Sequence, residues 1–415
     1  MKKSFAQKMA SSFARNKSSR TTAEVSAESS ASIADVSQST HSAATSRNLR
    51  ELSLRLDDYL EQTDLGGSEV ELDVISMSRQ IEKVQRYING SLPDSVKLHS
   101  LSERDLGLVK LAALSAKAVY ASDTAHSEQI AGLEDFPEYE NMQQSINVDA
   151  SFRDGTVKAT RVQLFSLQKG TPRKLLVVAL RGSSSMRRDW TINFDDIGQG
   201  TDGAGFINSD NFAYQVHGGF LECAKKMTDK VSEAISSILS KADTKDSADI
   251  RLLFTGHSAG GAVASLLYAH MMSKNPSILA DLYSRFTTID CIVFGSPPVT
   301  SPRLDTYGQD STFLSIINEG DPVPRMDKYY IESLLRVYLS PMPAVGMSRD
   351  LPQMVLDNAG MVLFLRDGVQ GVCAVPDDID QKETRKVMGA TMFGNPRAHK
   401  MNVYLWKLGL VKGAF

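Results

Sequence analysis

One short segment constrains the fold of this 415-residue chain more than any other. Gly256-His257-Ser258-Ala259-Gly260 follows the apolar, β-prone run 250–255 and precedes the run of small and apolar residues 261–267, which is typical of a helix. A strand that turns directly into a helix at Gly-x-Ser-x-Gly strains the serine backbone and leaves no room for side chains at the two glycines. The pattern predicts that Ser258 lies at the tip of a sharp turn. The alternative is a Gly-rich turn whose serine only caps the helix.

Strand-like and helical segments alternate around this motif, which is typical of an α/β architecture. The apolar run 174–180 is of the kind that is buried on both faces of a parallel sheet. With the Gly-x-Ser-x-Gly turn, the alternation predicts an α/β-hydrolase fold: a mostly parallel central sheet flanked by helices. The predicted strands are 157–167, 174–180, 250–255, 288–294 and 313–317, with a hairpin at 361–375, and the predicted helices are 106–120, 223–239 and 262–272.

The chain ahead of this region is divided by composition. Residues 1–48 are basic at the start and rich in Ser and Thr, which predicts a disordered tail. Phe5, Met9 and Phe13 recur at intervals of four, so a mitochondrial targeting helix or a membrane-surface contact is the alternative. Residues 49–97 carry apolar side chains at helical spacing and predict a helical N-terminal extension. Residues 98–415 form the predicted α/β domain.

The composition limits the partners and the location of the protein. A net charge of −3 and a pI near 6.2 do not indicate nucleic-acid binding. No run approaches the roughly 18–20 apolar residues of a membrane span, and the N-terminus lacks the apolar segment of a secretory signal. Three scattered cysteines indicate neither a zinc site nor a dense disulfide framework. We therefore expect an intracellular protein, cytoplasmic or peripheral to a membrane, of unspecified oligomeric state.

A serine hydroxyl needs a histidine to accept its proton and a carboxylate to orient that histidine. In this fold the order along the chain is Ser, acid, His, and only two of the seven histidines follow Ser258. His270 would lie on the helix that leaves the turn, about three turns away, and cannot fold back. His399, after the turn sequence Gly394-Asn395-Pro396, is therefore the predicted general base. A loop or helix-cap histidine without a catalytic task is the alternative.

The predicted acid is Asp321. It follows the β-prone segment 313–318, and catalytic groups gather at the carboxyl ends of strands in open α/β sheets. Pro322 and Pro324 would stiffen its loop. A turn aspartate without a catalytic role is the alternative, with Glu319 or Asp327 as replacement acids.

Four blocks, taken in order, resemble the class 3 lipases, the family of filamentous-fungal triacylglycerol lipases and their plant and animal relatives. The blocks are Leu180-Arg181-Gly182-Ser183-Ser184-Ser185, Val216-His217-Gly218-Gly219-Phe220, Thr255-Gly256-His257-Ser258-Ala259-Gly260-Gly261 and Phe294-Gly295-Ser296-Pro297. The loop 318–324 and His399 complete the likeness, which covers about 98–406. His217 precedes the nucleophile and His257 is its neighbour on a sharp turn, so we expect structural roles for both.

By this resemblance Ser183 takes the first position of the oxyanion hole, with its backbone N–H and hydroxyl, and Ala259 supplies the second N–H. The residues agree, because the hole needs one donor from a loop after a strand and one from the residue after the nucleophile. A plain turn serine is the alternative for Ser183. In the lipases of the family the next stretch is a lid. Here it would be 184–193, with Met186 and Trp190 as lid or substrate-binding residues; core packing is the alternative for Trp190.

The resemblance and the triad of Ser258, Asp321 and His399 imply a serine carboxylic ester hydrolase. We expect a lipase that cleaves acylglycerols through an acyl-enzyme on Ser258, with no metal and no organic cofactor. Its partner would be a lipid or other ester substrate at a membrane or lipid-droplet surface. Phospholipase A1 activity or acyl transfer by the same triad is one alternative. An inactive scaffold that binds partners through its N-terminal helices is another, and the intact triad argues against it.

Overall fold

The computed structural model describes residues 71–120, 139–151, 157–167, 173–182, 201–207, 213–241, 249–273, 275–305 and 310–411. The strands are β1 (Lys97–Leu98), β2 (Tyr139–Ser151), β3 (Val157–Leu167), β4 (Lys174–Leu180), β5 (Thr201–Asp202), β6 (Gln215–Val216), β7 (Ile250–His257), β8 (Thr288–Phe294), β9 (Thr300–Ser301), β10 (Phe313–Asn318), β11 (Met361–Leu365) and β12 (Cys373–Ala374). The α-helices are α3 (Glu71–Gln85), α4 (Glu103–Ala118), α6 (Gly218–Lys241), α7 (Ala259–Met272), α8 (Ile278–Asp281), α9 (Lys328–Leu339), α10 (Lys382–Ala390) and α11 (Met401–Lys407). Short 3₁₀ helices are η2 (Leu282–Arg285), η3 (Val323–Arg325) and η4 (Pro396–His399).

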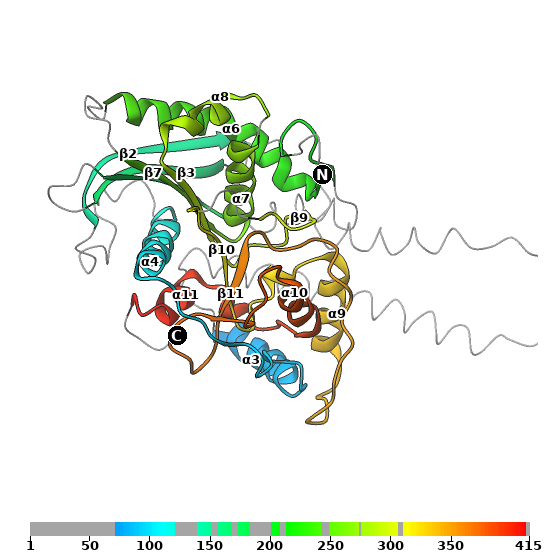
Figure 1. Cartoon of the computed structure of the whole chain (residues 1–415). Coiled ribbons are helices and arrows are strands. Elements are labelled where there is room, and N and C mark those ends of the chain that lie inside the picture. Colours follow the sequence, from blue (N-terminus) through cyan, green and yellow to red (C-terminus); the bar gives the residue numbers. More distant parts are fainter. Residues whose placement is uncertain are drawn as a thin grey trace, which may run out of the picture.

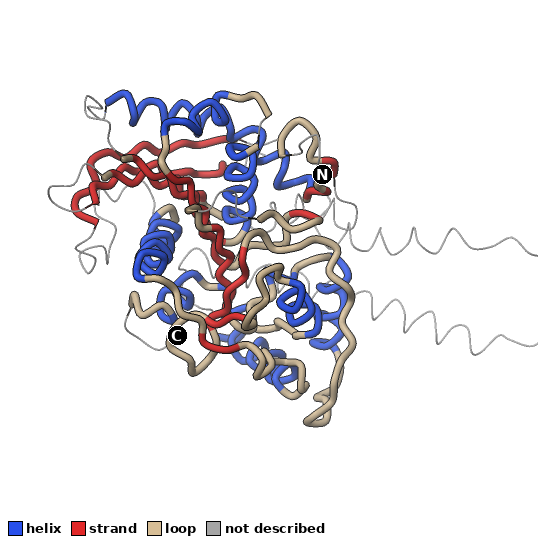
Figure 2. Tube along the Cα trace, viewed as in Figure 1, coloured by secondary structure: helices blue, strands red, loops and turns tan. Residues whose placement is uncertain are grey.

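Nine of the described strands form one sheet in the order β1-β12-β11-β10-β8-β7-β4-β3-β2. Figure 2 shows that this sheet is twisted. The neighbours from β4 to β11 are parallel, and the edge strands are antiparallel. Short strands β5, β6 and β9 form a second sheet. The predicted α/β-hydrolase arrangement, a mostly parallel sheet flanked by helices, is confirmed.

Strand β4 shows why its apolar run is continuous. Its side chains alternate between two cores: Leu176, Val178 and Leu180 belong to the core with α6 and α7, whereas Leu175, Val177 and Ala179 belong to the core with α4 and α11. Figure 1 shows these helix pairs on opposite faces of the sheet. Burial of each large side chain stabilises the fold by roughly 1.5–3 kcal/mol. The central strands are therefore held from both faces, and their carboxyl ends form a rigid edge.

Part of the predicted N-terminal extension packs against the α/β domain. Ile81 and Val84 of α3 share a buried cluster with α9, and the Lys83 ammonium donates to the carbonyl of Tyr338 at 2.5 Å. The predicted boundary between residues 97 and 98 falls within β1, which pairs with β12. The tail 1–48 and the extension up to residue 70 lie outside the described residues.

Several element limits differ from the sequence-based expectation. Helix α6 begins at Gly218 rather than at residue 223, because Phe220 and Leu221 are buried and hold the first turn despite its glycines. Helix α4 begins at residue 103, where the Ser102 side chain accepts from the Asp105 N–H and caps it. The hairpin expected at 361–375 is present as the antiparallel pair β11 and β12. None of the described helices is long and apolar enough to cross a membrane.

Candidate active site

The turn between β7 and α7 has the strained geometry that the glycine motif predicts. Ser258 has φ 57° and ψ −135°, a positive φ that is uncommon for a residue with a side chain. A Cβ on Gly256 would lie 2.6 Å from the Gly260 backbone, and a Cβ on Gly260 would lie 2.3 Å from the carbonyl oxygen of Leu180. Strand, turn and helix approach so closely that only glycine fits at both positions, and Ser258 lies at the tip between them.

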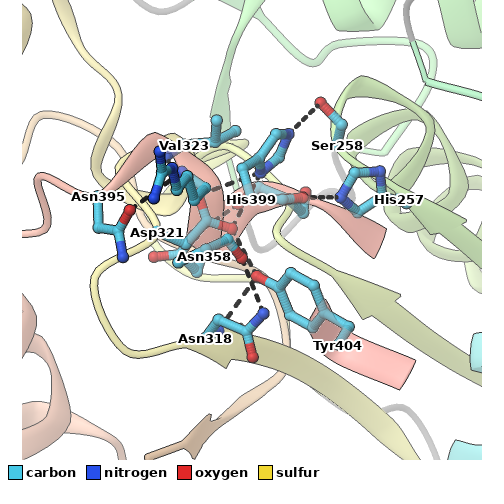
Figure 3. A network of polar contacts seen from close by, with 12 residues as sticks. His257, Ser258, Asn318, Asp321, Val323, Asn358, Asn395, His399 and Tyr404 are labelled. Atoms are coloured by element: carbon cyan, nitrogen blue, oxygen red, sulfur yellow. Dashed lines mark hydrogen bonds and ion pairs between the residues drawn. The ribbon is translucent and has the colours of Figure 1, made fainter. Parts of the chain in front are cut away.

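The structure brings Ser258, His399 and Asp321 together in one buried hydrogen-bonded chain (Figure 3). His399 Nε2 lies 3.0 Å from Ser258 Oγ. On the other side of the ring, His399 Nδ1 lies 2.9 Å from Asp321 Oδ2 and 3.1 Å from Oδ1. With Nδ1 donating to the carboxylate, Nε2 presents its lone pair to the serine hydroxyl. This is the arrangement in which a histidine accepts the proton of a serine nucleophile.

Asp321 is held by the turn that follows β10. Gly320 has φ +89°, which turns the chain back toward the sheet, and Asp321 Oδ1 accepts the Val323 N–H at 2.9 Å. The same turn is tied to the base by Asn318, whose side-chain amide donates to the carbonyl of Ala398 at 2.8 Å. The acid and the base therefore share one rigid junction at the carboxyl end of β10.

Tyr404 is a residue of this site that the sequence reasoning missed. Its hydroxyl donates to Asp321 Oδ2 at 2.5 Å and accepts the Asn318 N–H at 3.1 Å. Burial, followed by the neighbouring Asp321 carboxylate, raises the pKa of Tyr404 well above its usual value, so the hydroxyl stays a donor. It lies on α11 five residues after His399, but only the fold shows that this helix passes beneath the acid.

Gly295, directly after β8, has φ +52° and lies against the acid and base. A Cβ at this position would lie 2.8 Å from Asp321 Oδ2 and 3.1 Å from His399 Nδ1. The glycine of the Phe294-Gly295-Ser296-Pro297 block is therefore required by the close approach of the two side chains.

The residues weighed as alternatives have other tasks. Glu319 accepts the Leu92 N–H at 2.7 Å, and Asp327 caps α9 by accepting the Tyr330 N–H at 2.9 Å. His270 lies between the carbonyl of Phe206 and the hydroxyl of Ser277, both at 2.7 Å. The ring of His217 packs on Phe220 with centroids 4.3 Å apart.

His257, the neighbour of Ser258 in sequence, contacts the segment that carries His399. Its Nε2 lies 2.8 Å from the carbonyl oxygen of His399, and its Nδ1 lies 3.1 Å from the hydroxyl of Tyr120. Burial, reinforced by the His399 ring, lowers the pKa of His257 well below 6.5, so this imidazole is neutral.

The predicted oxyanion hole is described only in part. Ala259 is the first residue of α7, so its N–H belongs to the first turn, where N–H groups have no partner within the helix. Gly182, at the end of β4, lies beside the nucleophile, since a Cβ on it would be 3.1 Å from Ser258 Cβ. Ser183 and the predicted lid residues Met186 and Trp190 lie outside the described residues. In the described part of the chain, no cluster of His, Cys, Asp or Glu is placed to hold a metal ion.

Comparison with known proteins finds a family that part of this chain matches. Residues 177–330 match the model of the family described as Lipase (class 3). By this match the segment from β4 to α9 is similar to the class 3 lipases. A secreted mono- and diacylglycerol lipase of Fusarium solani is 28% identical over 188 residues, which are 44% of this chain and 48% of that protein. The match thus spans about half the length of each protein.

Solved lipase structures are similar at lower identity. The Rhizomucor miehei lipase in its propeptide complex is 13% identical, with a TM-score of 0.41 over 75% of this chain and 89% of that one. A mono- and diacylglycerol lipase from Aspergillus oryzae is 19% identical, with a TM-score of 0.34 over 55% of this chain and 75% of that one. The likeness to the class 3 lipases rests on the sequence match.

The family match includes Ser258 and Asp321 but ends before His399. His399, the predicted base, lies in the C-terminal segment, after β11, β12 and α10. The 3₁₀ helix η4, capped by the Asn395 side chain on the Arg397 N–H at 3.1 Å, places His399 against the acid.

Proposed function

We propose that this protein is a lipase of the class 3 type that hydrolyses lipid carboxylic esters, with Ser258 as nucleophile, His399 as general base and Asp321 as the orienting acid. The observation that carries the proposal is the buried chain from Ser258 Oγ through both nitrogens of His399 to the Asp321 carboxylate. The strained turn at Ser258 supports it, because such strain persists where a function requires it.

The geometry supports acyl transfer in two steps. His399 Nε2 takes the proton as Ser258 Oγ attacks the ester carbonyl, and the imidazolium then protonates the leaving alcohol. Water repeats the cycle on the acyl-serine and releases the fatty acid. The Ala259 N–H and the backbone and hydroxyl of Ser183 would bind the oxyanion, each donor being worth about 10²–10³ in rate.

For the substrate we propose acylglycerols at a lipid surface. The support is the family and the activity in the name of the Fusarium solani relative, a mono- and diacylglycerol lipase. Met186 and Trp190 are proposed as lid residues that contact the acyl chain. The intracellular location, with association to a membrane or lipid droplet, remains part of this proposal, as does the mitochondrial alternative.

The test is hydrolysis of soluble nitrophenyl esters and of emulsified mono-, di- and triacylglycerols by the wild type and by Ser258→Ala. Ser265→Ala is the matched control, because Ser265 is a buried serine of α7, the helix that follows Ser258, and its hydroxyl donates to Gly261 O at 3.0 Å. We expect Ser258→Ala to lose at least about 10³-fold in kcat, with the control close to the wild type. Equal activity of Ser258→Ala and the wild type would refute the nucleophile.

A further inference from the structure

A second hydrogen-bonded chain runs behind the triad, from the loop after β4 to the base. The Gly182 N–H donates to the Tyr120 hydroxyl at 3.1 Å, this hydroxyl lies 3.1 Å from His257 Nδ1, and His257 Nε2 lies 2.8 Å from the carbonyl oxygen of His399. The residues come from the end of α4, the end of β4, the end of β7 and η4. Four elements that surround Ser258 are thus joined through two side chains.

The donors and acceptors of this chain have one consistent arrangement. The carbonyl of His399 can only accept, so His257 Nε2 carries the hydrogen. A neutral His257 then accepts at Nδ1, which makes the Tyr120 hydroxyl the donor there. The oxygen of Tyr120 keeps a lone pair for the Gly182 N–H. Tyr120 therefore links Gly182 to the histidine.

The residues of this hydrogen-bonded chain are closely packed. A Cβ on Gly182 would lie 2.4 Å from the Tyr120 hydroxyl oxygen and 2.8 Å from the carbonyl oxygen of His257. The rings of His257 and His399 lie 4.6 Å apart, and both are buried. A shift of the Tyr120 hydroxyl would displace the loop at Gly182 and the ring of His257 together.

We propose that Tyr120, acting through His257, is a positioning residue that holds Gly182, the residue before the proposed oxyanion residue Ser183, and the backbone of His399 in fixed positions relative to Ser258. The inference rests on the proposed function, because the proposed function assigns Ser183, directly after Gly182, to the oxyanion hole. Alignment of donor, nucleophile and base matters most in the transition state. Loss of the link should therefore lower kcat and leave KM nearly unchanged.

The first test compares Tyr120→Phe with Tyr338→Phe on a soluble nitrophenyl ester. Tyr338 is the control, because its buried hydroxyl donates to the Gly394 carbonyl at 2.9 Å, so this variant also loses a tyrosine hydroxyl that makes a hydrogen bond. We expect Tyr120→Phe to lower kcat about three- to tenfold, the range of one such bond, with KM within about twofold. Tyr338→Phe should lower Tm by a similar amount and keep kcat. A lower Tm with wild-type kcat in Tyr120→Phe would overturn the proposal.

The second test asks whether Tyr120 acts through His257. His257→Gln keeps an amide donor for the His399 carbonyl and removes the Nδ1 acceptor. Tyr120→Phe should then cost less than about twofold in the His257→Gln background, because the link is already cut. The same fold-loss in both backgrounds contradicts the coupling. If His257→Gln fails to fold, as seen by near-UV circular dichroism, the comparison with Tyr338→Phe decides alone.

These outcomes separate the two proposals. A Ser258→Ala variant as active as the wild type refutes the proposed function. An inactive Ser258→Ala beside a fully active Tyr120→Phe refutes only the positioning role.

Discussion

Asp321→Asn changes one oxygen of a buried carboxylate into a donor and leaves the shape of the side chain almost unchanged. In the wild type, Oδ1 accepts the Val323 N–H at 2.9 Å, while Oδ2 accepts from His399 Nδ1 at 2.9 Å and from Tyr404 at 2.5 Å. If the amide oxygen keeps the Val323 N–H, the amide NH₂ faces His399 Nδ1. The ring must then accept at Nδ1 and carry its hydrogen on Nε2, toward Ser258, where it cannot take the serine proton.

The expected loss follows from the distance between the charges. Unit charges 2.9 Å apart attract by about 6 kcal/mol at an effective dielectric constant near 20, which bounds the stabilisation of the imidazolium. The wrong tautomer and the lost charge together cost about 10⁴ in kcat in triads of this kind, or roughly 5.5 kcal/mol. We expect a loss of that size with little change in KM.

The assay is the kcat for release of nitrophenol from a short-chain ester, with Glu319→Gln and Asp327→Asn beside it. Asparagine caps a helix as well as aspartate does, so Asp327→Asn should keep the cap of α9. Glu319 accepts hydrogen bonds from the N–H groups of Leu92 and Asp367. Both controls should stay within about threefold of the wild type in kcat. The assignment is wrong if Asp321→Asn keeps more than about a tenth of the activity, and a control that is inactive instead would identify the acid.

Two further predictions concern stability. Gly260→Ala should lower the free energy of unfolding by about 1–3 kcal/mol or prevent folding, because its Cβ would lie 2.3 Å from a backbone oxygen; Gly389→Ala in α10 meets nothing within 4 Å and should leave Tm unchanged or higher. Burial lowers the pKa of His270 from 6.5, so this histidine binds protons more weakly in the folded state. The contribution of neutral His270 to the free energy of unfolding is complete above pH 6.5. It is lost as the pH falls toward the pKa of the folded state, by up to about 1.4 kcal/mol per pH unit. We therefore expect His270→Gln to have a lower free energy of unfolding than the wild type at pH 7, measured by urea unfolding, and to lose less of it between pH 7 and 5. A free energy of unfolding that depends on pH as in the wild type would contradict this.

The sequence alone was sufficient for the parts of this protein that depend on local chemistry. The glycine spacing around Ser258 predicts a turn that no larger residue allows, and the close approaches at Gly256 and Gly260 confirm it. The apolar runs predict the central strands because a strand buried on both faces needs apolar residues throughout. Chain order alone singled out His399, and strand context favoured Asp321 over Glu319 and Asp327. The structure brings Ser258, Asp321 and His399 together, and their catalytic roles remain the proposal tested above.

Only the tertiary structure decided how these residues are supported. Tyr120 and Gly182 are 62 positions apart, and Tyr404 and Asp321 are 83 apart, yet each pair shares a hydrogen bond. Helical periodicity indicates which face of a helix is apolar, but not which strand end that face meets. The partner of a buried hydroxyl depends on that meeting, because a polar group enters the core only where the fold supplies its hydrogen bonds. The turn at Ser258 is thus determined by residues that are neighbours in the sequence, whereas the hydrogen bonds that support the site form only once distant segments have packed.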